Sequence, residues 1–132
     1  MRHLGIDFGT KKVGVAVSDE GGQMGFPHST LKNDDQLLAN IVSLIRANDV
    51  EAVVVGESRN LAGEENPVAK EAKVFAEKLQ VETGLPVHFE PEVFTTQEAG
   101  RGFDGERGAM KDVDASAAAL ILTSYLTRHG NH

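Results

Sequence analysis

The stretch Leu4–Asp19 reads LGIDFGTKKVGVAVSD and consists of two short apolar runs joined through Gly9, Thr10 and two lysines. Two apolar runs linked in this way predict a β-hairpin. Asp7 ends the first run, where a carboxylate is costly to bury unless a cation or hydrogen bonds compensate it. Asp7 is therefore either a functional carboxylate or a turn residue bonded to its own backbone, and this stretch alone does not decide between them.

The next segments predict an α/β fold that opens with antiparallel strands. A third strand at Met24–Leu31 would complete three such strands, and Pro27 indicates a sheet edge or an irregularity. From Asp34 or Asp35 to about Ala47, apolar residues recur at helical spacing, which predicts a helix that the aspartates could cap.

The second half of the chain alternates strands and helices. Glu51–Gly56 has the β-branched composition of a buried parallel strand. A helix is expected from Pro67 to about Thr83, with Gly84 as its stop, and Leu85–Glu90 predicts a further strand.

The last third predicts two helices separated by a loop. Thr95–Glu98 fits a capping box that would begin a short helix. Gly100–Lys111 is rich in glycine and is expected to form a loop. The final helix, Asp112 to about Tyr125, is apolar almost all round, which predicts a helix sandwiched between other elements.

Length and composition limit the class of protein. A chain of 132 residues fits a single domain, residues 1–132. It has no cysteine, which excludes disulfides and thiolate zinc sites, so any metal must bind oxygen or imidazole. The absence of an apolar stretch of signal-peptide or membrane-spanning length leads us to expect a cytoplasmic protein with no membrane partner. A net charge of −7 argues against bulk electrostatic coating of nucleic acid, but not against a nuclease that gains positive charge from metal.

Four acids occupy positions where a functional site is expected. Asp7, Glu57 and Glu92 stand at the ends of predicted strands, and functional groups in open α/β sheets collect beyond the carboxyl ends of strands. Asp114 heads the inward-facing stripe of the final helix. If they converge, these acids would hold Mg²⁺ or Mn²⁺ for phosphodiester hydrolysis. The alternatives are a solvated loop acid for Glu92 and an ordinary first-turn acid for Asp114.

Four segments resemble, in the same order, the YqgF (RuvX) family. They are Gly5–Asp19, Val53–Gly56, Glu92–Thr96 and Val113–Ala118. The resemblance implies a ribonuclease H-like fold related to the RuvC resolvases, here with a five-stranded mixed sheet of three antiparallel strands followed by two parallel ones, flanked by helices. It also implies a nuclease that acts on structured nucleic acid, either resolving Holliday junctions or maturing the 5′ end of pre-16S rRNA.

The resemblance also assigns site residues. The family's catalytic, metal-binding acids fall on Asp7, Glu92 and Asp114 of this sequence. If Glu92 does not lie near Asp7, Glu57 is the candidate replacement ligand.

This sequence departs from the family pattern beside those acids. Pro91 and Val93 stand where the family has Asp and Arg, and Lys12 stands for the usual Arg of the first motif. Lysine lacks the bidentate guanidinium, so the grip on phosphate is weaker. Glu57 and Ser58 also follow Gly56 where the family has Leu and Pro. Altered substrate preference or reduced activity is therefore expected.

Nucleic acid is the expected partner. The candidate backbone contacts are Lys12, Arg59, Arg101, Arg107 and Lys111. Symmetric junction resolution needs two active sites related by a two-fold axis, so a homodimer is expected for that role. Two other classes stay open: a non-catalytic nucleic-acid-binding domain of the same fold, and an ATP-using phosphotransferase lobe, which the Asp-x-Gly-Thr hairpin also resembles. The histidines form no ligand spacing, and no role is assigned to them.

Overall fold

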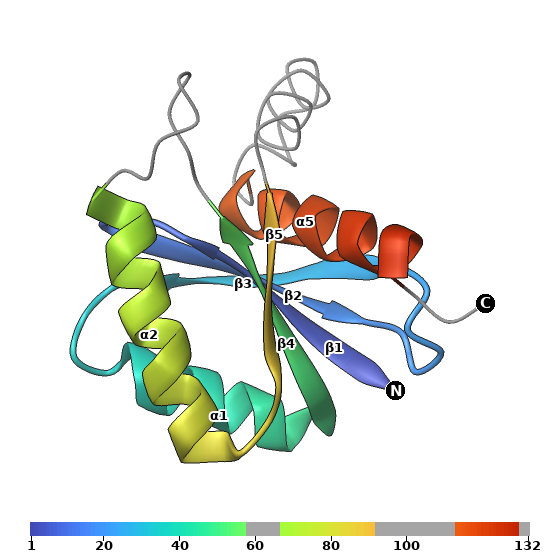
Figure 1. Cartoon of the computed structure of the whole chain (residues 1–132), viewed down its shortest axis with the longest axis horizontal. Coiled ribbons are helices and arrows are strands. Elements are labelled where there is room, and N and C mark those ends of the chain that lie inside the picture. Colours follow the sequence, from blue (N-terminus) through green and yellow to red (C-terminus); the bar gives the residue numbers. More distant parts are fainter. Residues whose placement is uncertain (58–66, 92–112, 130–132) are drawn as a thin grey trace.

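The computed structural model describes residues 1–57, 67–91 and 113–129, which form one sheet with helices on both faces (Figure 1). The elements in chain order are β1 (Arg2–Phe8), β2 (Lys12–Ser18), β3 (Gly25–Lys32), α1 (Leu37–Ala47), β4 (Val50–Glu57), α2 (Pro67–Thr83), β5 (Val87–Pro91) and α5 (Val113–His129). The predicted helix at Thr95 and the segment Gly100–Lys111 lie outside the described residues.

The sheet has the strand order β3-β2-β1-β4-β5. β1 pairs antiparallel with β2, and β2 pairs antiparallel with β3. β4 then pairs parallel with β1, and β5 pairs parallel with β4. The predicted arrangement of three antiparallel strands followed by two parallel ones is confirmed. Pro27 lies on an edge strand, beside a register shift between Val15 and Ala16, as its type predicts.

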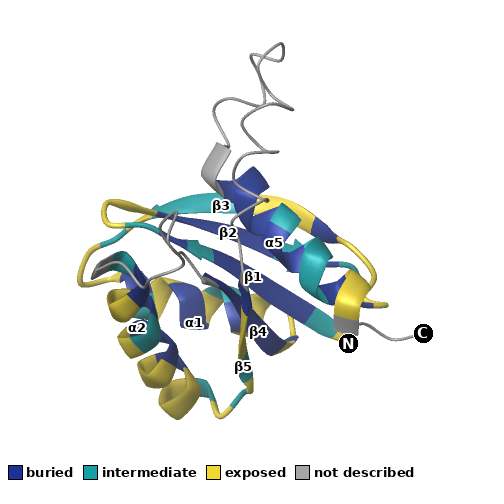
Figure 2. Cartoon of the chain, turned by 45° about the horizontal axis from the view of Figure 1, so that its top comes forward, coloured by how far each residue is buried: buried dark blue, intermediate teal, exposed yellow. Residues whose placement is uncertain are grey.

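Strand alternation divides the core into two layers. Leu4 and Ile6 of β1 lie on the face that packs against α1 and α2, in one cluster with Ile41 and Leu79. On the opposite face, a second cluster joins β2 and β4 to α5 (Figure 2). The central strands β1, β2 and β4 are thus largely buried on both sides, by one pair of helices on one face and a single described helix on the other, whereas the edge strand β3 is mostly exposed or half-buried.

The start of α1 differs from the sequence prediction, whereas both ends of α2 agree with it. α1 begins at Leu37, because the Oδ1 atom of Asp34 accepts the backbone N–H of Gln36 at 2.9 Å and closes a turn before the helix. Gln36, the N-cap residue, makes no side-chain capping bond. α2 runs from Pro67 to Thr83 as predicted, and Gly84 ends it with a left-handed φ of 73°.

α5 packs very close to the sheet. A Cβ atom on Gly5 of β1 would lie 2.8 Å from the Cβ atom of Leu122 and 2.9 Å from the carbonyl oxygen of Ala118. Residues 115–119 are all buried, which is more than a full turn, so the prediction of all-round burial holds for this part of the helix. Thr127 and Arg128, near the end of α5, are exposed. Within the described ranges, no helix has the length and hydropathy needed to cross a membrane.

Candidate active site

Asp7 occupies the face of the sheet that packs against α5. Its β1 neighbours Ile6 and Phe8 belong to the core under α1 and α2, so strand alternation directs Asp7 to the other side. Asp7 is half-buried and lies one residue before the carboxyl end of β1. Its partner across the β1–β2 ladder is Gly14, which carries no side chain. Ladder pairing therefore holds the Asp7 backbone at the end of the sheet where functional groups of α/β proteins collect.

Contacts between β1 and α5 define how the helix lies across the strand. The rings of His3 and Tyr125 are 6.2 Å apart, and Gly5 meets Leu122 and Ala118. Residues nearer the carboxyl end of β1 therefore contact residues nearer the start of α5. Asp7 is about 6.6 Å further along the strand than Gly5, and one helical turn before Ala118 is about 5.4 Å. The first turn of α5 is consequently the part of the helix that comes next to Asp7.

The other predicted ligands are described only in part. Asp114 is the second residue of α5 and Glu57 the last residue of β4, and the backbones of both are described whereas their side chains are not. Glu92 follows the last residue of β5 and lies outside the described residues. Figure 1 draws the start of α5 at the end of the sheet where β4 and β5 stop. Convergence of the acids stays a prediction.

Of the predicted metal ligands and phosphate contacts, only Asp7 and Lys12 have side chains among the described residues. Among the described residues, no three His, Asp or Glu side chains lie close enough together to hold a metal ion. Lys12 is exposed at the start of β2. The other four predicted nucleic-acid contacts, Arg59, Arg101, Arg107 and Lys111, lie outside the described residues.

An ion pair between a buried carboxylate on β5 and an exposed guanidinium near the end of α5 links the two elements, and the sequence analysis missed it. Glu90 is 2% exposed. Its Oε2 atom accepts a hydrogen bond from the Ser124 hydroxyl at 2.8 Å and one from Nη1 of Arg128 at 3.0 Å. Glu90 lies two residues before Glu92, so these bonds fix the strand that leads to a predicted ligand. The i, i+4 spacing of Ser124 and Arg128 was the available signal, because it puts them on one helix face.

Two histidines that had no expected role pack around Tyr125. Its ring stacks on His88 with centroids 5.3 Å apart and tilts against His3. Burial raises the pKa of the Tyr125 hydroxyl, and the negative charge of Glu90 raises it further. Burial also lowers the pKa of His3 below 6.5. The ring of His3 is buried between the sheet and α5, that of Tyr125 is half-buried, and His88 is exposed.

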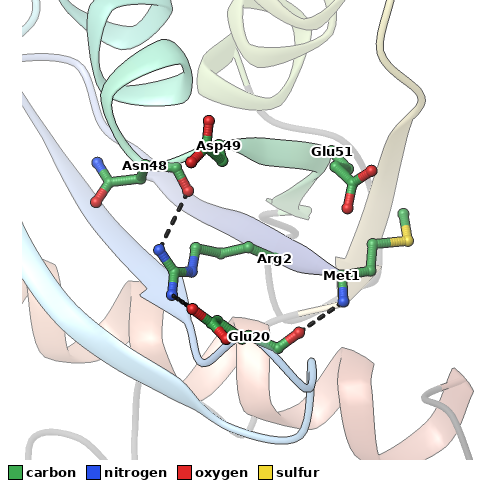
Figure 3. A pocket seen from close by; sticks show the side chains of 6 residues that line it. All are labelled: Met1, Arg2, Glu20, Asn48, Asp49 and Glu51. Atoms are coloured by element: carbon green, nitrogen blue, oxygen red, sulfur yellow. Dashed lines mark hydrogen bonds and ion pairs between the residues drawn. The ribbon is translucent and has the colours of Figure 1, made fainter.

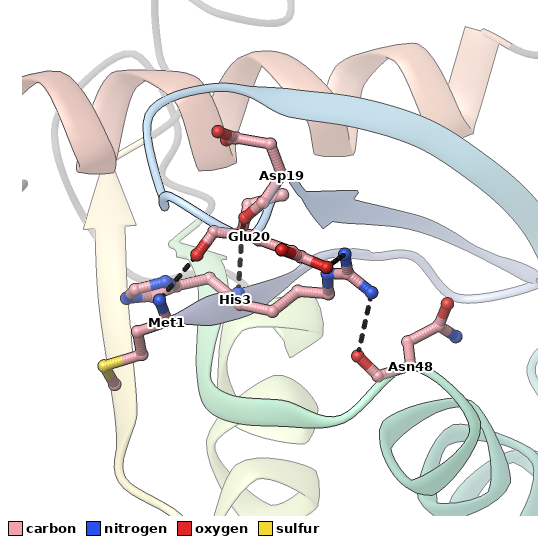
Figure 4. Close-up of polar contacts among 7 residues, drawn as sticks. Met1, His3, Asp19, Glu20 and Asn48 are labelled. Carbon is pink, nitrogen blue, oxygen red and sulfur yellow. Dashed lines mark hydrogen bonds and ion pairs between the residues drawn. The ribbon is translucent and has the colours of Figure 1, made fainter.

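A surface pocket of about 330 Å³ lies at the opposite end of β1 (Figure 3). It is lined by Met1, Arg2, Glu20, Asn48, Asp49 and Glu51. Arg2 is already engaged there, by the Glu20 carboxylate at 3.6 Å and by the carbonyl oxygen of Asn48 at 3.3 Å. The amine of Met1 donates to the Glu20 carbonyl oxygen at 2.6 Å (Figure 4). Because this pocket is at the amino end of β1, it is separate from the Asp7 site.

Comparison with known proteins assigns the family. Residues 1–128 match the model of a family described as "RuvX: Holliday junction resolvase". The chain belongs to the RuvX family. A relative from Moorella thermoacetica is 41% identical over 138 residues, which cover 100% of this chain and 99% of the relative, and it is named "Putative pre-16S rRNA nuclease". A relative from Lactobacillus gasseri with the same name is 38% identical over 136 residues, which cover 96% of this chain and 95% of the relative.

Solved structures with this fold include two resolvases. "T. thermophilus RuvC in complex with Holliday junction substrate" has a TM-score of 0.66 at 23% identity and covers 98% of this chain and 97% of that chain. The Fowlpox virus resolvase complexed with Holliday junction DNA has a TM-score of 0.64 at 12% identity, covering 97% and 98%. At these identities the likeness shows the fold alone, and it confirms the expected ribonuclease H-like architecture.

Proposed function

We propose that this RuvX-family chain is a metal-dependent endonuclease with Asp7, Glu92 and Asp114 as its metal ligands. The observation that carries the proposal is the position of Asp7, half-buried near the carboxyl end of β1 and on the face that α5 covers. The way α5 crosses β1 supports the proposal, because Gly5 meets Ala118 and backbone position 114 lies about one helical turn before Ala118. In the sequence, Glu92 comes directly after Pro91, the last residue of β5, and β5 runs in the same direction as β4 and β1.

The chemistry of these donors fits Mg²⁺ or Mn²⁺. Both ions prefer carboxylate oxygens, and this chain has no thiolate to favour a softer metal. A bound divalent ion would stabilise charge on the phosphate and activate the attacking water. The protein's own part is to hold Asp7 rigidly, because β1 is paired on both sides, with β2 and with β4. Its half-burial also limits the water that competes for the carboxylate.

The substrate is proposed to be structured nucleic acid. The names of the relatives point to pre-16S rRNA, and the family description points to Holliday junctions. The basic residues proposed to contact phosphate are Lys12, Arg59, Arg101, Arg107 and Lys111. A homodimer is proposed only for junction cleavage, because two strands must then be cut symmetrically. Cytoplasmic location stays a prediction, which cell fractionation can test.

A cleavage assay tests this function. Labelled pre-16S rRNA fragments, single-stranded RNA and a four-way DNA junction are incubated with the protein and Mg²⁺, Mn²⁺ or EDTA. We expect metal-dependent cleavage by the wild type, lost in Asp7→Asn and Asp114→Asn. Asp49→Asn is the matched control, because Asp49 is exposed, lies at the far pocket and has a left-handed φ of 54° that asparagine tolerates.

Two outcomes would overturn the proposal. Wild-type cleavage rates in Asp7→Asn would exclude metal catalysis at this site. Tight binding of nucleic acid with no cleavage of any substrate would instead assign the non-catalytic binding role.

A further inference from the structure

Two lysines face each other on the same side of the sheet as Asp7. Lys12 lies two residues from Gly14, the ladder partner of Asp7, and Lys32 is directly opposite Lys12 in the β2–β3 ladder. Val13, between Lys12 and Gly14, belongs to the core under α1 and α2. Strand alternation therefore directs Lys12 and Lys32 to the side that carries Asp7.

A third lysine stands in the tight turn beside this pair. The backbone N–H of Asn33 donates to the carbonyl oxygen of Lys11 at 2.9 Å, and its side-chain Nδ2 donates to the carbonyl oxygen of Gly9 at 2.7 Å. The β1–β2 turn is thus tied to the end of β3. Lys11, Lys12 and Lys32, which we call the lysine patch, are all exposed on this fixed backbone.

Repulsion within the lysine patch lowers the stability of the fold, and no described residue offsets it. Like charges directly opposite each other on neighbouring strands repel. Within residues 1–57, 67–91 and 113–129, no carboxylate lies within ion-pair distance of these lysines. A lysine on an edge strand can protect the sheet from edge-to-edge pairing, which accounts for Lys32 on β3. It does not account for Lys12 opposite, which lies on an inner strand.

We propose that the lysine patch binds consecutive phosphates of one nucleic-acid strand, next to the phosphodiester that lies at Asp7. This inference rests on the proposed nuclease function and extends its substrate path from Lys12 to Lys11 and Lys32. Lys12 is about 6.6 Å along β2 from the position opposite Asp7, so the patch lies within a nucleotide or two of that site. Lysine ammonium groups contact phosphate as point charges, so the patch grips strands without reading sequence. The bound phosphates would supply the anions that the lysine pair lacks among the described residues.

Salt-dependent binding tests the lysine patch without requiring cleavage. A labelled RNA hairpin and a labelled four-way DNA junction are titrated with wild type, Lys12→Gln, Lys32→Gln and the double variant in EDTA. Each lost phosphate contact should reduce the slope of log K against log salt by about 0.7 to 0.9, so the double variant should lose about twice that. Lys78→Gln, an exposed lysine on α2 across the sheet, is the matched control and should keep the wild-type slope.

Charge reversal adds a stability readout that a purely structural lysine would not give. Lys32→Glu places opposite charges across the β2–β3 ladder and keeps a charged edge strand, so the free protein should melt at a higher temperature while its affinity for the probes falls. If the wild type binds the probes and the double variant has the same slope of log K against log salt, the proposal that the lysine patch binds phosphates is overturned. The nuclease proposal is not affected by that result. Wild-type protein that neither binds nor cleaves these probes overturns both.

Discussion

Asp7 is a half-buried carboxylate at the position proposed for the metal site. It interrupts a strand whose neighbouring residues Ile6 and Phe8 are buried, and it is itself half-buried. A carboxylate in such a place is retained at a cost that a bound cation would offset. The geometry argues against the turn-capping role, because Asp7 pairs with Gly14 within the β1–β2 ladder and does not lie in the turn itself.

Metal binding should stabilise the wild type but not Asp7→Asn. A ligand that binds only the folded state raises its stability by about 2.7 kcal/mol at a concentration 100 times the dissociation constant. Thermal melts with and without Mn²⁺ should show a clear rise in Tm for the wild type and for the control Asp49→Asn. An equal rise in Asp7→Asn would mean that the ion binds elsewhere.

His3 should make stability fall in mild acid. Burial lowers its pKa in the folded state below 6.5, so the unfolded chain takes up the proton first as the pH falls. The stabilising contribution is complete above pH 6.5 and is lost as the pH falls through the folded-state pKa. Urea unfolding across this range should show a shallower fall in the free energy of unfolding for His3→Phe than for the wild type. Parallel pH curves for the two proteins would assign the acid sensitivity to other groups.

At the scale of elements, α5 contacts both β1 and β5. Its middle rests on Gly5, its last turns are bonded to β5 through Glu90, and its first turn is directed toward Asp7. A shift of α5 would therefore change the separation of positions 7 and 114. The Glu90 contacts act on this geometry from outside the site.

Replacing Arg128 alone should lower the free energy of unfolding more than replacing both Arg128 and Glu90. Arg128→Gln removes a cation that compensates the buried carboxylate of Glu90. A hydrogen bond to a charged group contributes about 1.5–3 kcal/mol to stability, and the exposure of Arg128 reduces the loss expected here. Adding Glu90→Gln should recover part of the loss, because the buried charge is then gone. Thr127→Gln, at the neighbouring exposed position, is the control. Additive effects in denaturant unfolding would show that the two residues are not coupled.

At the scale of the whole molecule, the two ends of β1 carry different features. The carboxyl end carries Asp7, with the lysine patch beside it, while the amino end carries the pocket at Arg2 and Glu20. One chain supplies one Asp7, so symmetric cleavage of a junction needs two chains.

We therefore expect junction cleavage, but not cleavage of single-stranded RNA, to depend on dimer formation. The rate on a four-way junction should rise more steeply than linearly with protein concentration below the dimer dissociation constant, and sedimentation should detect two chains per junction. Linear dependence, with paired symmetric nicks made by a monomer, would contradict this expectation.

Much of the fold could be predicted because its signals are local. Two short apolar runs predicted β1 and β2, and a β-branched run predicted β4, each to within a few residues, while Pro67 and Gly84 predicted both ends of α2. The start of α1 was wrong by two or three residues, since Asp34 bonds a backbone group before the helix and does not cap it. For the site, the sequence selected Asp7 and its motif, whereas the convergence of Glu92 and Asp114 with it remains a prediction.

The sequence by itself determined the kinds of element, their order, the family and the candidate acids, because residue spacing and short motifs are properties of neighbouring residues. Only the tertiary structure decided which distant residues meet. Glu90 and Arg128 are 38 positions apart in the sequence. The pairing of Lys12 with Lys32 depends on the register of β2 and β3, and the contact of α5 with Gly5 depends on where the helix packs. Register and placement follow from how whole faces pack, and no short window of sequence contains that information.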